Sequence, residues 1–291
     1  MIDFMRYKIV YFSLSLAVIL PGLFSLIRFG LRPGIDFTGG SRLEVKFISG
    51  ERPKLLEIRE SLPKDFGTAT VQLVGEETVI VKTMTITKEQ AQAIKDGLAT
   101  KFGEVEEVLF ETVGPIVGKE LLQKTVVGVS LAAGLIMLYV MYRFNELKYG
   151  VCAILAMLHD SLILLGSFSL LGHFYGTEVD GLFVTAVLTV LSFSVHDTIV
   201  VYDRIRESRK KHPKEDFVNL VNVAVGETLG RSVNNSMTII FMLLALLLLG
   251  GETIRWFVLA LLLGTITGTY SSPFTAVPLL VVWEKWLGRQ K

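Results

Sequence analysis

The chain has 291 residues, of which 51% are hydrophobic and 20% are charged. Its net charge of +1 leaves no basic excess, so the composition does not point to a nucleic-acid partner. The single cysteine, Cys152, excludes an intrachain disulfide. Several apolar runs of about 18 or more residues are each long enough to cross a hydrocarbon core of roughly 30 Å. These properties favour a polytopic membrane protein over a soluble one.

The first apolar run extends from about Ile9 to Ile27 and follows Arg6 and Lys8. It is longer than the apolar core of a signal peptide, and no Ala-x-Ala cleavage pattern follows it. We therefore expect an uncleaved first spanning helix, in which Pro21 and Gly22 are placed to introduce a kink.

A glycine-rich segment, Gly34-Ile35-Asp36-Phe37-Thr38-Gly39-Gly40, follows this helix. It is not a phosphate-binding loop, because no Lys-Ser or Lys-Thr pair follows at the required spacing. The plainest interpretation is a turn that links the first helix to the first strand.

Between about residues 41 and 112 charged residues appear throughout, and the apolar residues become periodic. Alternating apolar residues predict four strands, around Leu43–Phe47, Val71–Leu73, Val79–Val81 and Val108–Phe110. Gly75-Glu76-Glu77 suits a hairpin turn between the second and third strands. Helices are predicted for Pro53–Leu62 and, after a capping box of Thr87 and Gln90, as far as about Phe102. The order β-α-β-β-α-β is the ferredoxin-like arrangement of a small α+β domain.

Five further apolar runs follow this domain and bring the predicted number of spanning helices to six. They are roughly Leu121–Tyr142, Val151–Leu171, Leu182–Tyr202, Ser236–Leu249 and Trp256–Trp283. The predicted organisation is therefore a first helix (1–30), a small domain with its connecting loops (31–118) and a five-helix region (119–291).

Lysine and arginine residues in the short loops orient the predicted bundle, because cytoplasmic segments are rich in them. With six spans the basic segments all fall on one side: Arg6, Lys8; Arg143, Lys148; Arg204, Arg206, Arg209, Lys210, Lys211, Lys214; Lys285, Arg289, Lys291. Arg28 and Arg32, at the outer end of the first helix, depart from the pattern. We expect both termini in the cytoplasm and the small domain outside it.

Asp197 lies inside an apolar run, where a charge costs at least about 2.5–3.5 kcal/mol on insertion scales. Six residues separate it from Arg204, which places it on the order of 10 Å inside the cytoplasmic boundary. Low dielectric disfavours the charged form of a carboxyl group, so this side chain can load and release a proton. The alternative is a structural carboxylate that pairs with an arginine or accepts bonds from hydroxyl groups. We favour proton or ion handling.

His159 and Asp160 lie at a similar predicted depth in the third span and can join Asp197 in one polar cluster. Neighbouring residues face different directions on a helix, so we expect only one of the two to point into such a cluster. A packing hydrogen bond to serine or threonine is the competing interpretation. An intramembrane metal site with His196 is disfavoured, because adjacent residues do not easily present both side chains to one ion.

Arg231 has two interpretations. It can anchor the start of the fifth span at the cytoplasmic surface, which its position alone favours. Alternatively the helix begins earlier, near Val223, and Arg231 faces Asp197 as its charge partner. Asn234 and Asn235 follow it and are unusually polar for a spanning helix, which indicates an interior face.

Five motifs in this order resemble the SecF family of protein-export membrane proteins, over nearly the whole chain. They are Gly34–Gly40, Thr112–Leu121 (with Gly114, Pro115 and Gly118), His159-Asp160, Asp197–Glu207 and Thr269–Ser272. The resemblance implies a subunit that pairs with SecD, a homologous six-helix protein, in the RND superfamily. The pair would use the proton motive force to assist the SecYEG channel and SecA in moving unfolded polypeptides.

The resemblance further implies Asp197 as the proton-linked carboxylate and Arg231 as its linked arginine. It implies YajC and YidC as further partners, the proton as coupling ion and no cofactor. Many members have asparagine where His196 stands, so this histidine is a departure from the pattern. It also implies that Asp36, Gly39, Gly40, Gly114, Pro115 and Gly118 belong to the segments that join the small domain to the helices, and we expect the glycines to allow a hinge there.

Two alternatives remain open. A self-contained RND-type exporter of small molecules would need a larger outer domain and a second six-helix half. A scaffold that only stabilises the translocase would make Asp197 structural. An enzyme is the least favoured class, because no nucleophile–base pair or nucleotide loop stands out.

Overall fold

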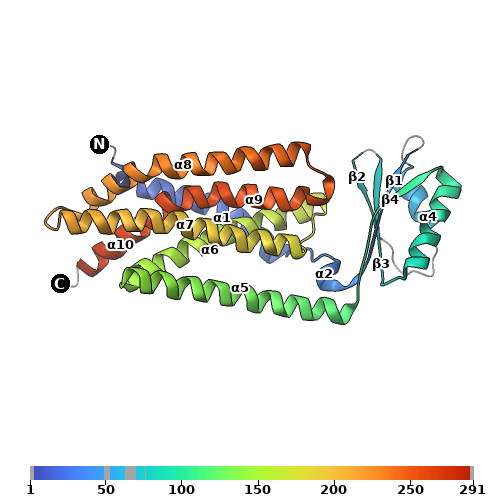
Figure 1. The fold of residues 1–291 in the computed structure, drawn as a ribbon, viewed down its shortest axis with the longest axis horizontal. Helices are drawn as coiled ribbons and strands as arrows, with labels where there is room; N and C mark the ends of the chain where they lie inside the picture. The colour runs from blue at the N-terminus through green and yellow to red at the C-terminus, as the bar shows by residue number, and fades with distance from the viewer. Residues whose placement is uncertain (1–2, 49–52, 63–69, 76, 289–291) are drawn as a thin grey trace. The chain divides into compact units, whose positions relative to one another are not determined.

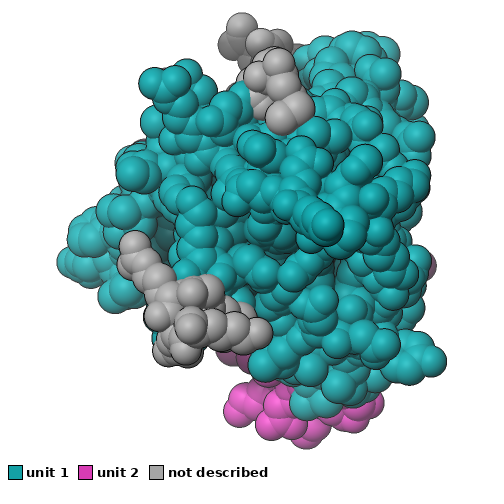
Figure 2. All heavy atoms as spheres, turned by 90° about the vertical axis from the view of Figure 1, so that its left-hand side faces the viewer, with its two compact units in different colours: residues 1–32, 127–291 teal, residues 33–126 magenta. Residues whose placement is uncertain are grey.

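The computed structural model describes residues 3–48, 53–62, 70–75 and 77–288. Contacts divide the chain into two compact units, residues 1–32 with 127–291 and residues 33–126, which are described separately below. The first unit contains the helix bundle, and Figure 2 shows its end-on surface.

The smaller unit is an antiparallel sheet covered by helices (Figure 1). In chain order its elements are α2 (Ile35–Thr38), β1 (Gly40–Phe47), α3 (Leu55–Ser61), β2 (Thr70–Val74), β3 (Thr78–Thr83), α4 (Lys88–Phe102) and β4 (Val105–Val113). The strand order β2-β3-β1-β4 brings the first and last strands together. This confirms the predicted ferredoxin-like arrangement.

The core of this unit lies between the sheet and the helices α3 and α4. The alternating residues Leu43, Val45 and Phe47 of β1 are all buried there, together with Ile94 and Leu98 of α4. The predicted capping box is present, because the Thr87 side chain accepts from the Gln90 backbone and the Gln90 side chain accepts from the Thr87 backbone.

The prediction that Val71 and Leu73 of β2 both face the core is only half right. Val71 points into the core, whereas Leu73 is exposed. Because β2 pairs only with β3 and lies at the edge of the sheet, packing constrains Leu73 little. β2 and β3 are antiparallel neighbours, as the predicted hairpin requires, but its residue Glu76 lies outside the described residues.

The glycine-rich segment packs directly on the first turn of α5 (Pro115–Phe144). Gly39 has φ +75°, and a Cβ atom there would stand 2.6 Å from the Cα of Pro115. A Cβ on Gly118 would stand 2.9 Å from the backbone nitrogen of Gly39 and 3.0 Å from the carbonyl oxygen of Phe37. These glycines are therefore required by positive φ and by the close approach of two backbones. They form a packed joint.

The larger unit is built mainly from long helices. In chain order its elements are the short η1 (Phe4–Tyr7), α1 (Lys8–Arg28), α5 from residue 127 onward, α6 (Leu147–Tyr175), α7 (Gly181–Lys211), α8 (Phe217–Leu249) and α9 (Glu252–Ser271). The last of these continues through η3 (Ser272–Ala276) into α10 (Val277–Gly288). Six helical segments in the described residues are long and apolar enough to cross a membrane, as the sequence predicts. The chain is a multi-pass membrane protein.

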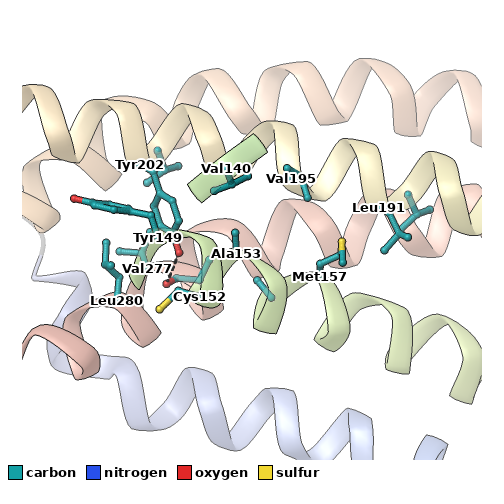
Figure 3. Close-up of a cluster of buried hydrophobic side chains, with 14 of the residues drawn as sticks. Val140, Tyr149, Cys152, Ala153, Met157, Leu191, Val195, Tyr202, Val277 and Leu280 are labelled. Atoms are coloured by element: carbon teal, nitrogen blue, oxygen red, sulfur yellow. Dashed lines mark hydrogen bonds between the residues drawn. The ribbon is translucent and has the colours of Figure 1, made fainter. Parts of the chain in front are cut away.

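Three of these spans form the centre of the bundle. About half of the most apolar stretch is buried in α6 and α7 (56% and 50%) and in the last span (50%), against 17% in α1 and α8 and 6% in α5. The interior side chains of α6, α7 and α10 interlock around Tyr149, Cys152, Tyr202 and Val277 (Figure 3). The hydroxyl of Tyr202 donates to the carbonyl oxygen of Ala276 at 3.1 Å.

Ion pairs gather the predicted cytoplasmic ends at one end of the bundle. Lys148 and Arg209 both bind Glu284, at 2.9 and 3.2 Å, and so connect the start of α6, the end of α7 and α10. The backbone nitrogen of Met5 donates to the side chain of Asn222 on α8 at 3.0 Å, so η1 lies at this end as well. The predicted C-terminal residues Arg289 and Lys291 lie outside the described part of the chain.

The fifth span differs most from its predicted bounds. We expected it from Ser236, but α8 begins at Phe217. Arg231 is therefore fourteen residues into the helix and does not precede it, as the alternative with an earlier helix start predicted. The polar residues between Asn222 and Asn235 lower the local hydropathy, and they hid a helix whose buried face continues through Val225, Thr228 and Ser232.

Candidate polar site in the helix bundle

Asp197 lies half-buried on α7, where that helix meets α8 and α9. Its carboxylate faces the hydroxyl of Ser232 on α8 and the imidazole of the adjacent His196. A small pocket opens beside it, and its polar and apolar lining residues are Phe193, His196, Asp197, Asn235, Ser236, Ile239, Thr265, Gly268 and Thr269. The predicted membrane carboxylate therefore borders a cavity with several hydrogen-bonding side chains, which is the environment that a proton-exchanging group requires.

Asp160 is the most deeply buried acidic side chain of this region, with no exposed surface. Its Oδ2 atom accepts a hydrogen bond from the hydroxyl of Ser194 on α7 at 2.5 Å and another from Ser271 on α9 at 2.6 Å. Its Oδ1 atom lies 2.9 Å from Nδ1 of His159. Three helices of the bundle centre therefore converge on one carboxylate.

The structure brings His159 and Asp160 into one cluster, contrary to our expectation that only one of them would point inward. Both side chains are buried. Adjacent residues on a helix diverge, but the imidazole ring is long enough to turn back onto the carboxylate. His196, the other histidine of the predicted pair, is exposed beside Asp197.

Asp160 and Asp197 do not share a hydrogen-bonding partner among the described residues, so the single cluster that we expected is two. Ser194, which binds Asp160, belongs to a group of hydroxyl-bearing side chains that also includes Thr198 of α7 and Ser272 of η3. Ser272 and Thr198 hydrogen-bond each other at 3.0 Å, and the Ser272 hydroxyl also lies 3.2 Å from the carbonyl oxygen of Ser194. The bundle thus contains one fully enclosed carboxylate, Asp160, and one that borders a pocket, Asp197.

Arg231 is exposed on α8 and forms no ion pair with any residue that the structure describes. The predicted pair with Asp197 is therefore not formed in this structure. Asn234 and Asn235 on the same helix are exposed too, so α8 carries a strongly polar, uncovered surface within a spanning segment.

The predicted joint residues are all in the smaller unit. Asp36 is half-buried in the first turn of α2, and Gly40 has φ +124° at the start of β1. Pro115 begins α5, and Gly114 precedes it in an open position where an added Cβ would meet only Val117, at 4.0 Å.

Sequence reasoning missed Ser194, Ser271 and the wide turn η3, which is a π-helix. Ser271 and Ser272 were noticed as part of a motif, but no role was given to them. The available signal was the Ser-Ser-Pro run inside an apolar helix, because a proline removes a backbone hydrogen bond and wide turns of this kind are frequent at functional sites.

Two family models match the chain. The C-terminal model of the protein export membrane proteins SecD/SecF matches residues 93–286, and the SecD/SecF GG motif matches residues 24–47. The latter covers the glycine-rich segment that packs on α5. The chain belongs to the SecD/SecF family of protein-export membrane proteins.

The similar proteins agree with this assignment. A protein translocase subunit SecF of Thermobaculum terrenum is 44% identical over 98% of this chain and 94% of its own length. The protein translocase subunit SecDF of Bacillus subtilis is 35% identical over 99% of this chain and 38% of its own length. The crystal structure of SecDF from Thermus thermophilus, titled a translocon-associated membrane protein, is 33% identical with a TM-score of 0.87. This chain covers 39% of that SecDF chain and so matches one part of it.

Proposed function

We propose that this chain is the SecF subunit of a proton-driven export complex, which pairs with SecD and assists the SecYEG channel and SecA in moving unfolded polypeptides across the bacterial cytoplasmic membrane. Its relatives that carry both parts in one chain support the SecD partner. YajC and YidC remain partners predicted by resemblance alone.

The observation that carries the proposal is the position of Asp197. A carboxylate halfway into a spanning helix is retained at a cost of at least about 2.5–3.5 kcal/mol, which indicates a functional role. Its pocket is lined by polar groups of α8 and α9, including Asn235, Ser236 and Thr269. Such groups can hold the water through which a proton reaches the carboxylate.

Arg231 supports the same mechanism. A guanidinium group within a membrane span requires a counter-charge, and it has none among the described residues. We infer that the ionised Asp197 attracts Arg231 in one state of the working cycle and that protonation releases it. A partner helix that covers the polar face of α8 would keep this exchange out of the lipid.

The packed joint between Gly39 and Gly118 offers a route from the bundle to the outer unit. Because the backbone of α2 and its C-cap Gly39, just before β1, packs directly on the first turn of α5, a displacement of α5 would be transmitted without being absorbed by a flexible loop. The driving energy is adequate, since moving one charge through 100 mV supplies about 2.3 kcal/mol.

We infer that both termini are cytoplasmic and that the small domain is extracytoplasmic. Arg143, Lys148, Arg206 and Arg209 gather at the bundle end that also holds η1 and α10. Such an accumulation of positive charge is typical of the cytoplasmic side.

The test is to replace Asp197 with asparagine and to measure protein export with and without a proton gradient. Asp203→Asn is the matched control, because Asp203 lies on the same helix but is surface-exposed and pairs with Arg143 at 3.0 Å. A scaffold that does not couple to protons predicts the same export rates for both variants.

A further inference from the structure

His159 has one ring nitrogen that hydrogen-bonds within the bundle and one that does not. Nδ1 lies 2.9 Å from Oδ1 of Asp160. Nε2 is buried and has no hydrogen-bond partner among the residues that the structure describes. A buried polar atom without a partner loses its hydrogen bonds to water and gains none in return, which is unfavourable. A position that tolerates this cost calls for an explanation other than packing.

The surroundings of Asp160 leave few routes by which a proton can reach it. Its side chain has no exposed surface. Ser194 and Ser271 already direct their hydroxyl hydrogens at Oδ2, and the remaining neighbour is the His159 ring on Oδ1. Of these three groups only imidazole takes up and releases a proton in the physiological pH range.

The ring of His159 lies against Tyr270, whose own contacts are with α1. The His159 ring lies nearly parallel to that of Tyr270, at a centroid distance of 6.3 Å. The Tyr270 hydroxyl donates to the carbonyl oxygen of Tyr11 on α1 at 2.9 Å and lies 3.5 Å from the hydroxyl of Ser15. Among the described residues, the titratable groups placed against His159 are therefore Asp160 and Tyr270, with Tyr11 behind Tyr270. This polar seam leads toward α1, whereas Asp197 faces α8.

We propose that His159 transfers protons to and from Asp160, on a second branch of the proton path that approaches from the α1 side. Nε2 takes a proton from a hydronium ion, which leaves as water, while the Nδ1–H bond breaks and that proton passes to Oδ1 of Asp160. The ring ends neutral with its hydrogen on Nε2, and Asp160 ends neutral and protonated. Release follows the reverse steps. The proposal rests on proton coupling as the function and adds to it a route and a residue.

The test compares His159→Asn with His173→Asn. The asparagine amide can still donate to Oδ1 of Asp160, but it has no second nitrogen to accept a proton. His173 lies on the same helix, exposed and stacked on Phe29 at 3.8 Å, so its replacement controls for loss of a histidine. The full chain, purified with its partner, is subjected to a pH jump, and the infrared band of the protonated Asp160 carboxyl is followed. Its loss in Asp160→Asn assigns the band.

We expect the Asp160 band to appear about 10²-fold more slowly in His159→Asn, a reduction typical of losing a positioned proton-transfer group, and at the parental rate in His173→Asn. A parental rate in His159→Asn would overturn the proposal. If that variant does not fold, nitrogen NMR of the parent decides, because the proposal requires hydrogen on Nδ1 and a bare Nε2 while Asp160 is ionised. Hydrogen on Nε2 in that state would also overturn it.

The experiments distinguish failure of this proposal from failure of the proposed function. If Asp197→Asn keeps its response to the proton gradient, proton coupling through Asp197 fails whatever the infrared rates are. If Asp197→Asn loses that response but His159→Asn matches the parent in the infrared measurement, the second branch fails and proton coupling through Asp197 stands.

Discussion

Ser194 on α7 donates a hydrogen bond of 2.5 Å to Oδ2 of Asp160 on α6 and so connects two central helices through a buried carboxylate. Ser194→Ala removes this donor and should lower the free energy of unfolding by about 1.5–3 kcal/mol, the range for a hydrogen bond to a charged group. Thermal unfolding in one detergent measures the change. Ser192→Ala is the control, since Ser192 is exposed on the same helix. Equal losses of stability in the two variants would contradict the assignment.

The joint between the glycine-rich segment and α5 should be intolerant of side chains. Gly118→Ala places a Cβ 2.9 Å from the backbone nitrogen of Gly39, so one backbone must move, and we expect a loss of about 1–3 kcal/mol. Gly97→Ala is the matched control: Gly97 lies in the helix α4 with nothing within 4 Å of an added Cβ, and alanine should raise stability by roughly 0.5–1 kcal/mol. Proteolysis of the folded smaller unit reports both effects, and similar protection of Gly118→Ala and the parent would show that the joint is loose.

Much of this architecture follows from the sequence because its physical signals are local. Apolar runs reveal spans regardless of their neighbours, and the alternation of Leu43, Val45 and Phe47 reflects a sheet with one buried face. The start of α8 was missed because hydropathy averages over both faces of a helix. Its buried face there is built from small and polar residues such as Ser232.

The candidate site was predicted only in part for a different reason. Asp160 and Asp197 both interrupt apolar runs, and nothing in their sequence neighbourhoods says which one is enclosed. Ser271, which does enclose Asp160, is 111 residues away in the sequence. The role of Gly118 was likewise hidden, because a glycine required for close backbone approach looks the same in sequence as one that permits flexibility.

Glu284 should stabilise the end of the bundle that holds the basic residues. Its carboxylate accepts from Lys148, whose side chain is only 8% exposed, and from Arg209. Glu284→Gln leaves Lys148 with Glu146 as its remaining ion-pair partner, and we expect a loss of about 1–3 kcal/mol. Glu207→Gln breaks solvent-exposed pairs with Arg204 and Lys211 and should cost less than Glu284→Gln. If the two variants unfold at the same midpoint, this role for Glu284 is refuted.

The orientation of the chain can be tested by cysteine labelling. Glu89→Cys, on α4 of the small unit, should react with a membrane-impermeant maleimide only from the outer face. Lys210→Cys, near the end of α7, should react only from the cytoplasm. Both side chains are exposed, and the native Cys152 is buried, so background reaction is small. The reverse pattern of labelling would invert the topology.

The most direct test of the account is export by the complex that contains Asp197→Asn, measured with and without a proton gradient. Asparagine has nearly the size of the neutral carboxyl group but cannot ionise, so the account predicts that the gradient-dependent part of export is lost. Folding and association with the SecD partner should remain at parental levels. Asp203→Asn should keep the full response. Parental export by Asp197→Asn, with its response to the gradient intact, would contradict proton coupling at this residue and leave the scaffold as the better explanation.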